Sequence, residues 1–186
     1  MYTNACEGVQ WSCDWSAGVR IDNPRGRYGI RLAHRRLRIV RTYCLIGGLA
    51  VNCYVEPVYT LDADIVVIAA NLPELTSHLE KEGLKTEVHA HPVNATARSE
   101  LRIQFTTDER YQAFLARSVE AEVLGIRARV ACLEDVTRGK LWAYSDARRR
   151  LSKRKKDELD LIRLAEAYPE LKSLYPSELR EQLDRG

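Results

Sequence analysis

The chain has 186 residues, of which 45% are hydrophobic and 30% charged, a composition that fits one folded domain and excludes a largely disordered protein. No stretch approaches the roughly 18 apolar residues of a membrane-spanning helix, and the N-terminus lacks the basic and apolar regions of a secretory signal. The net charge of +3 is too small to indicate nucleic-acid binding by itself, while five cysteines without a CxxC pair favour reduced thiols in the cytoplasm over a disulfide framework or a zinc ribbon.

The sequence predicts three successive parts. Residues 1–31 show neither helical nor strand periodicity, so we expect an irregular N-terminal extension. An alternative hypothesis places the natural start of the protein downstream of it. We expect residues 32–132 to form an α/β core and residues 133–186 to form C-terminal helices packed on that core.

The order of the predicted elements indicates the fold class. Strands concentrate early and helices late, without regular βαβ repetition, so we predict an α+β fold. The expected strands are 43–46, 60–69, 86–88, 101–105, 119–123 and 126–131, with the last two joined as a hairpin. The expected helices are 33–40, 49–54, 72–83, 108–117, 134–144, 150–167 and a short one after Pro176.

Two short motifs lie on either side of one predicted helix. An apolar run ends at Gly47-Gly48, which predicts a buried strand followed by a tight turn. Fourteen positions after Gly48, the next strand carries Asp62 and Asp64. Side chains alternate along a strand, so both carboxylates are expected on the same face. The spacing allows the chain to cross one helix and return on a neighbouring strand.

Together the two motifs are typical of a phosphate- and metal-binding site. Carboxylates that share a face repel each other, and a divalent cation between them removes that repulsion. The backbone of Gly47-Gly48 has no Cβ atoms, so a phosphate can approach it closely. Phosphoryl or nucleotidyl transfer requires this combination. Taken separately, the glycine pair is better explained as a plain turn, and Asp62 and Asp64 as two solvated surface acids.

These residues resemble a known signature. An apolar strand, two glycines and a DxD pair are similar to the motif of the polymerase-β-like nucleotidyltransferase superfamily. The segment 126–144, with Arg149 and residues 155–161, resembles the minimal nucleotidyltransferases related to abortive-infection type IV toxins (AbiEii-like). The resemblance covers residues 41–167. It implies a mixed β-sheet flanked by helices, with a helical C-terminal part.

The resemblance also implies roles for individual residues. Asp62 and Asp64 would hold Mg²⁺ or Mn²⁺, and Gly47 and Gly48 would contact the phosphates of an NTP. Lys140 would face the site from the helix that follows the LED sequence. Lys156 and Asp160 are further candidates for the same neighbourhood.

Two positions depart from the superfamily pattern. Active members carry a third carboxylate on a later strand, and Gln104 stands in its place in the segment LRIQF. A neutral amide binds a metal less tightly than a carboxylate and cannot act as a base toward an incoming hydroxyl. Glu100 or Asp108 would substitute only if the strand had another register. Val58 stands where relatives commonly have arginine.

Other features have plainer interpretations. Seven basic residues lie within 148–156, and they form either a solvated helix start or a contact surface for RNA or nucleotide phosphates. His89 and His91 lack a third ligand nearby, which favours a surface strand end over a metal site. Leu159, Ile162 and Leu164 are expected in the core.

The sequence therefore supports three functional hypotheses. The first is a Mg²⁺-dependent nucleotidyltransferase that moves an NMP from an NTP to an RNA, protein or small-molecule acceptor; the resemblance adds a toxin–antitoxin role with a cognate antitoxin. The second is a catalytically degenerate module that binds a nucleotide, an RNA or a protein through the same cleft. The third is a partner-binding scaffold that docks an acidic surface through its basic helix.

Overall fold

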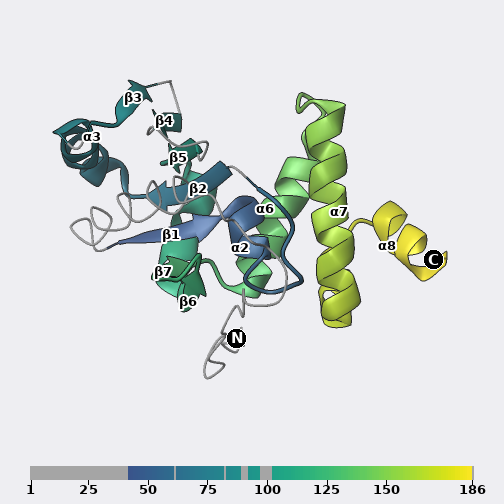
Figure 1. Cartoon of the computed structure of the whole chain (residues 1–186). Helices are drawn as coiled ribbons and strands as arrows, with labels where there is room; N and C mark the ends of the chain where they lie inside the picture. Colours follow the sequence, from purple (N-terminus) through teal and green to yellow (C-terminus); the bar gives the residue numbers. More distant parts are fainter. Residues whose placement is uncertain (1–41, 61, 82, 89–91, 97–101, 186) are drawn as a thin grey trace. The chain divides into compact units, whose positions relative to one another are not determined.

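The computed structural model describes residues 42–60, 62–81, 83–88, 92–96 and 102–185 (Figure 1). The expected extension 1–31, the expected helix 33–40 and the two histidines at 89 and 91 lie outside the described residues. The chain divides into two compact units, residues 1–132 and residues 133–186. In the described part of the chain, no helix combines the length and the hydropathy that a membrane crossing requires.

The first unit is built on a mixed β-sheet. Its strands are β1 (Tyr43–Ile46), β2 (Asp62–Val67), β3 (Lys85–Val88), β4 (Pro92–Thr96), β5 (Arg102–Thr106), β6 (Val119–Val123) and β7 (Ile126–Val130). Among the described residues they form one seven-stranded sheet in the order β3-β4-β5-β2-β1-β7-β6. β2 pairs with β5, and β1 with β7, in parallel; the other neighbours are antiparallel.

Short helices connect these strands. They are α2 (Gly47–Val51), α3 (Leu72–Lys81), α4 (Glu109–Gln112) and α5 (Phe114–Arg117), with a 3₁₀ turn, η2 (Ala69–Asn71), before α3. α2 packs against β1 and β2, and α3 packs against β3. The α+β class predicted from the order of elements, a mixed sheet flanked by helices, is confirmed.

Alternation along the central strands separates the core from the polar face. Ala63 and Ile65 of β2 are 0% and 1% exposed, and Ile103 and Phe105 of β5 are equally buried. The residues between them are polar and partly or fully exposed. The apolar side of β2 and β5 therefore anchors these strands and turns their polar positions to the opposite face.

Several elements differ from the sequence prediction; among them, the single helix expected over 108–117 is divided into α4 and α5. The helix after β1 begins at Gly47 and ends at Val51, earlier at both ends than the expected 49–54. β4 was not predicted; it begins at Pro92, and proline is tolerated at the first residue of a strand. The hairpin between β6 and β7 has the expected turn, since Leu124 and Gly125 both have positive φ, 54° and 75°.

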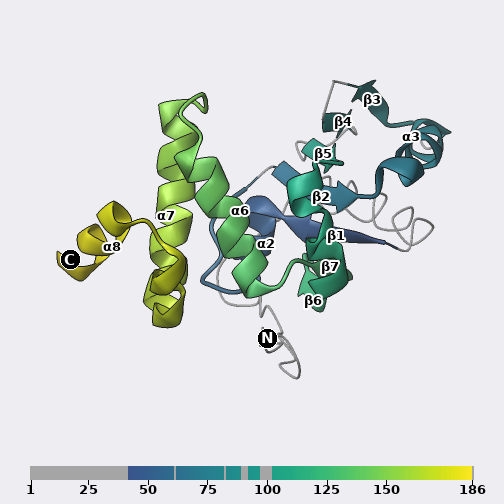
Figure 2. The same ribbon diagram turned by 180° about the vertical axis from the view of Figure 1, so that it is seen from behind.

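The second unit is helical. It contains α6 (Leu133–Ser145), α7 (Leu151–Ala167), a 3₁₀ helix η3 (Pro169–Leu174) and α8 (Ser177–Arg185). α6 and α7 pack side by side, as both ribbon views show (Figures 1 and 2). The prediction that Leu159 lies in the core is wrong, because its exposure is 51%. Asp157 and Asp160 are buried on α7 instead.

Candidate functional site

The glycine turn and the second carboxylate of the DxD pair meet at the end of β1. The antiparallel register places Ile46 opposite Asp64, so the next residue, Gly47, lies beside that carboxyl group. Gly47 has φ +70°, a left-handed conformation that favours glycine. A Cβ added to it would lie 3.0 Å from Cγ of Asp64 and collide with the carboxylate. Position 47 is therefore confined to glycine by its backbone and by its neighbour.

Thr60 lies between the second glycine and the backbone of Asp62. Its side chain is buried, and Oγ1 lies 3.4 Å from where a Cβ of Gly48 would stand. The same oxygen accepts a hydrogen bond of 3.4 Å from the backbone N–H of Asp62. The start of β2 is thus held against the start of α2.

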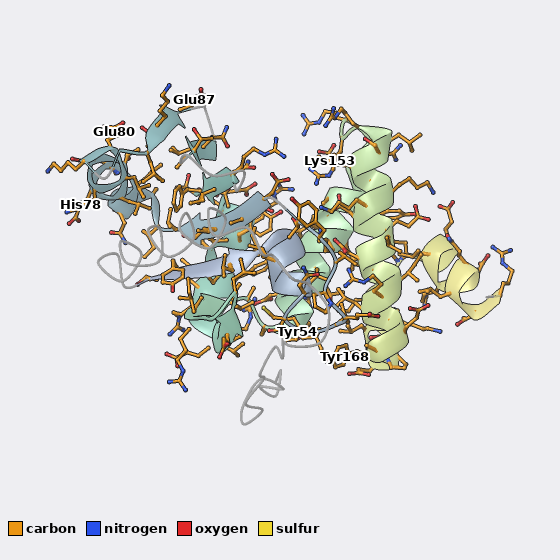
Figure 3. All side chains as sticks on the ribbon, in the orientation of Figure 1. Tyr54, His78, Glu80, Glu87, Lys153 and Tyr168 are labelled. Atoms are coloured by element: carbon orange, nitrogen blue, oxygen red, sulfur yellow. The ribbon has the colours of Figure 1, made fainter. Side chains whose placement is uncertain are left out.

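The loop between α2 and β2 is closed by one asparagine. The buried Asn52 donates from Nδ2 to the carbonyl of Val58 at 2.7 Å, and its Oδ1 accepts from the N–H of the same residue at 3.1 Å. Tyr54, just beyond α2 (Figure 3), donates its hydroxyl to the carbonyl of Ala131 at 2.7 Å. These buried bonds fix the loop that returns the chain to Asp62.

The polar face of β2 continues onto β5. The parallel register places Arg102 opposite Asp62 and Gln104 opposite Asp64. Nη2 of Arg102 lies 2.9 Å from Oδ1 of Asp62. Gln104 is exposed, and Asn94 of β4 stands opposite it on the other side. Two carboxylates, one guanidinium and two amides therefore share this part of the sheet.

The chemistry of this donor set fits one divalent cation better than two. Carboxylate and amide oxygens are ligands that Mg²⁺ and Mn²⁺ accept. Gly47 leaves the space beside the carboxyl group of Asp64 free of a side chain. However, no group of three or more His, Cys, Asp or Glu side chains gathers anywhere in the described residues. Asp62 and Asp64 would hold the cation, with the amide oxygen of Gln104 as the nearest neutral donor by register.

Lys140 belongs to a buried ion network in the second unit. Its Nζ lies 2.9 Å from Oδ1 of Asp157 and 2.7 Å from Oδ2 of Asp160. Each carboxylate has a second cation, since Arg149 contacts Asp157 at 2.7 Å and Arg163 contacts Asp160 at 2.9 Å. Burial disfavours the charged ammonium, but the two carboxylates outweigh that effect and raise the pKa of Lys140 above 10.5. Lys140 is thus a cation at neutral pH, joining α6 to α7.

The basic segment of the second unit surrounds the start of α7. Lys153 lies on the first turn of α7 (Figure 3), and Lys156, proposed from the resemblance as a nucleotide contact, is half-buried one turn later. Nζ of Lys155 pairs with Glu158 at 2.7 Å. The first unit therefore brings together Gly47, Gly48, Asp62 and Asp64, while the second unit holds Lys140 and Lys156.

Three residues near the carboxylates were not identified from the sequence. They are Asn52, Thr60 and Arg102. Arg102 could have been predicted from the sequence, because it precedes Gln104 by two positions and therefore lies on the same face of the strand. Thr60 could have been predicted in the same way, since it precedes Asp62 by two positions, whereas Asn52 could not, because its partner Val58 is set by the path of the loop.

Solved structures with this fold were found, although none is close in sequence. No protein-family model matches the chain, and no curated protein matches it significantly. ANT(2'')-Ia in complex with adenylyl-2''-tobramycin is 13% identical over 86% of this chain and 97% of its own, with a TM-score of 0.61. JHP933 from Helicobacter pylori is 15% identical over 87% and 72%, with a TM-score of 0.56. The lincosamide antibiotic adenylyltransferase LnuA, bound to lincomycin, is 16% identical over 74% and 96%, with a TM-score of 0.51. The chain therefore has the nucleotidyltransferase fold.

Proposed function

We propose that the protein is a metal-dependent nucleotidyltransferase. In this reaction an acceptor attacks the α-phosphorus of an NTP, and pyrophosphate leaves. The contact between Gly47 and the carboxylate of Asp64 carries the proposal, because it unites a side-chain-free backbone with a metal-ligating group at one strand end. Asp62, on the same face of β2, supplies the second carboxylate.

The residues of the first unit have distinct proposed roles. Asp62 and Asp64 would hold Mg²⁺ or Mn²⁺, which when bound supplies positive charge to the phosphates and the attacking oxygen. Gly47 and Gly48 would let the backbone approach the leaving pyrophosphate. Catalysis of this kind is mostly positioning and electrostatic stabilisation, so the fixed loop behind Asp62 matters as much as the ligands.

Two lysines of the second unit also have proposed roles. Lys140 would neutralise charge on the phosphates, and Lys156 would contact the nucleotide. Lys140 already pairs with Asp157 and Asp160, which favours a role in holding α6 and α7 together. The stability of Lys140→Met separates the two roles.

We propose a small molecule as the first acceptor class to test. ANT(2'')-Ia was solved with an adenylylated aminoglycoside, and LnuA is described as an antibiotic adenylyltransferase. RNA and protein acceptors remain candidates from the AbiEii-like resemblance, which would also imply a cognate antitoxin.

A second candidate function is supported by Gln104. Because Gln104 stands opposite Asp64, the cluster has an amide where a third carboxylate would complete the ligand set. A nucleotide-binding module without turnover is consistent with this substitution.

Binding and transfer are tested in sequence. We expect thermal stabilisation by at least one of the four NTPs in the presence of Mg²⁺ or Mn²⁺, and little without metal. The effective NTP, labelled at the α-phosphate, is then offered to aminoglycosides, lincosamides, RNA and cell-extract proteins. Binding with transfer supports the first function, and binding without transfer to any acceptor supports the second.

A pair of isosteric variants provides the control. Asp64→Asn removes one proposed ligand charge, whereas Glu122→Gln removes the same charge from an exposed position on β6. We expect only Asp64→Asn to abolish metal-dependent stabilisation. Full retention of it in Asp64→Asn would contradict the proposed site.

A further inference from the structure

Arg102 introduces a positive charge into the proposed metal site. Its guanidinium reaches Asp62 because β5 lies parallel to β2 with these two residues in register. The arginine side chain is 64% exposed and that of Asp62 is 28% exposed. Ion pairs this exposed are weak and exchange readily with solvent and ions. The guanidinium therefore lies close enough to offset the negative charge of the carboxylates. Its ion pair with Asp62 is weak enough to be broken when another ligand binds.

Arg102 weakens the attraction of the cluster for a bare dication. Asp62 and Asp64 contribute two negative charges, Arg102 one positive charge and Gln104 none, leaving one negative unit. A free divalent cation thus meets a partly neutralised site and a repelling guanidinium. A metal–triphosphate complex, by contrast, is an anion, and its phosphates offer the guanidinium bidentate acceptors.

We propose that Arg102 makes metal binding at Asp62 and Asp64 conditional on a nucleoside triphosphate. In the free protein Arg102 pairs with Asp62 and lowers the affinity of Asp62 and Asp64 for a free dication. When the metal arrives with a triphosphate, Arg102 moves from the carboxylate to the phosphates, and the two ligands bind cooperatively. Arg102 is thus a positioning and selectivity residue of the site. The inference rests on the proposed function.

The experiment measures Mn²⁺ binding rather than turnover. Free Mn²⁺ is quantified by electron paramagnetic resonance with the full chain, alone and with each of the four α,β-methylene nucleoside triphosphates. The variants are Arg102→Gln, Arg102→Lys and Arg127→Gln. Arg127 is an exposed arginine on β7 and serves as the matched control for loss of one positive charge. Circular dichroism checks that each variant folds.

The proposal predicts a specific pattern. Wild type binds Mn²⁺ weakly alone and at least tenfold more tightly with the effective triphosphate. Arg102→Gln binds free Mn²⁺ roughly tenfold more tightly than wild type, as removal of one like charge near a dication implies. It also loses most of the coupling between metal and nucleotide, which must be reciprocal. Arg102→Lys keeps the coupling in part, and Arg127→Gln changes neither quantity.

Failure of this inference is distinguishable from failure of the proposed function. If Arg102→Gln matches wild type in both free-metal affinity and coupling, the inference is overturned while the metal–nucleotide site stands. If Arg127→Gln has the same effect as Arg102→Gln, the effect is one of net charge, and the inference is again overturned. If wild type with a triphosphate binds no more Mn²⁺ than the same triphosphate binds without protein, at millimolar concentration and for all four nucleotides, the proposed function itself fails.

Discussion

Gln104 stands directly opposite Asp64 on the neighbouring parallel strand, with both side chains on the polar face of the sheet. This register makes Gln104 the position from which a third carboxylate would complete the ligand set of Asp62 and Asp64. The amide is exposed, so replacing it requires no repacking of the core.

Gln104→Glu is expected to raise Mn²⁺ affinity. An additional carboxylate beside Asp64 would increase the affinity by roughly tenfold or more, since ligand charge count tunes divalent-cation binding. Calorimetric titration with Mn²⁺ measures it. Asn94→Asp is the control, because it adds the same charge one strand further away. An equal gain in both variants would show a general field effect and not a new ligand.

Gly47→Ala is expected to destabilise the first unit and abolish nucleotide binding. The left-handed backbone alone costs alanine about 1–2 kcal/mol, and the added Cβ would in addition displace the carboxylate of Asp64. Gly83→Ala is a matched control, since Gly83 also has positive φ, +82°, but nothing lies within 4 Å of the added Cβ. Urea unfolding should show the larger loss at position 47. Equal losses of unfolding free energy in the two variants would mean that the Asp64 carboxylate moves away from the added Cβ without a cost in stability.

Lys140→Met is expected to destabilise the helical unit. Removal of one partner from a buried ion cluster costs about 3–5 kcal/mol, although Arg149 and Arg163 remain to pair with Asp157 and Asp160. Lys155→Met, which removes an exposed lysine that pairs with Glu158 on α7, should change stability less. Denaturant unfolding followed by far-UV circular dichroism measures both. A Lys140→Met protein of normal stability that has lost transfer would instead assign Lys140 to the phosphates.

The helical unit is expected to lose stability at alkaline pH. Burial raises the pKa of the Tyr175 phenol above its ordinary 10.0, while its hydroxyl donates to the carbonyl of Leu161 at 2.7 Å. A group whose pKa is raised by folding stabilises fully below its unfolded pKa, and that contribution declines as pH rises above about 10. The raised pKa of Lys140 has the same sign.

Thermal unfolding between pH 7 and pH 11 tests this expectation. Tyr175→Phe should be less stable than wild type at pH 7 and should decline less steeply above pH 10. Parallel declines in the two proteins would exclude Tyr175 as a source of the alkaline sensitivity.

Alternation of polar and apolar residues predicted much of the first unit. What it missed depends on the pairing of strands that are distant in the sequence. Alternation in β2 was sufficient to place Asp62 and Asp64 on one face, and the Leu124-Gly125 turn was readable because its flanking strands alternate. The ion pair from Arg102 to Asp62 depends on two strands that are forty positions apart and in parallel register. No single-strand pattern encodes that register.

The helical unit shows a different limit of sequence reasoning. Periodicity placed Leu159 in the core, whereas the buried face of α7 contains Asp157 and Asp160. Their burial depends on cations from α6, from the loop before α7 and from α7 itself. Hydrophobic patterning cannot detect a core in which opposite charges are buried as pairs.

The two adjacent glycines differ in how much change they tolerate over generations. Every amino-acid substitution at position 47 introduces a Cβ toward Asp64, so each missense codon there damages the backbone and the carboxylate together. At position 48 a Cβ would meet the hydroxyl of Thr60 at 3.4 Å, a contact that a small local shift relieves. Packing therefore leaves no neutral path away from glycine at position 47, whereas at position 48 the remaining constraint is the proposed approach of phosphate to the backbone.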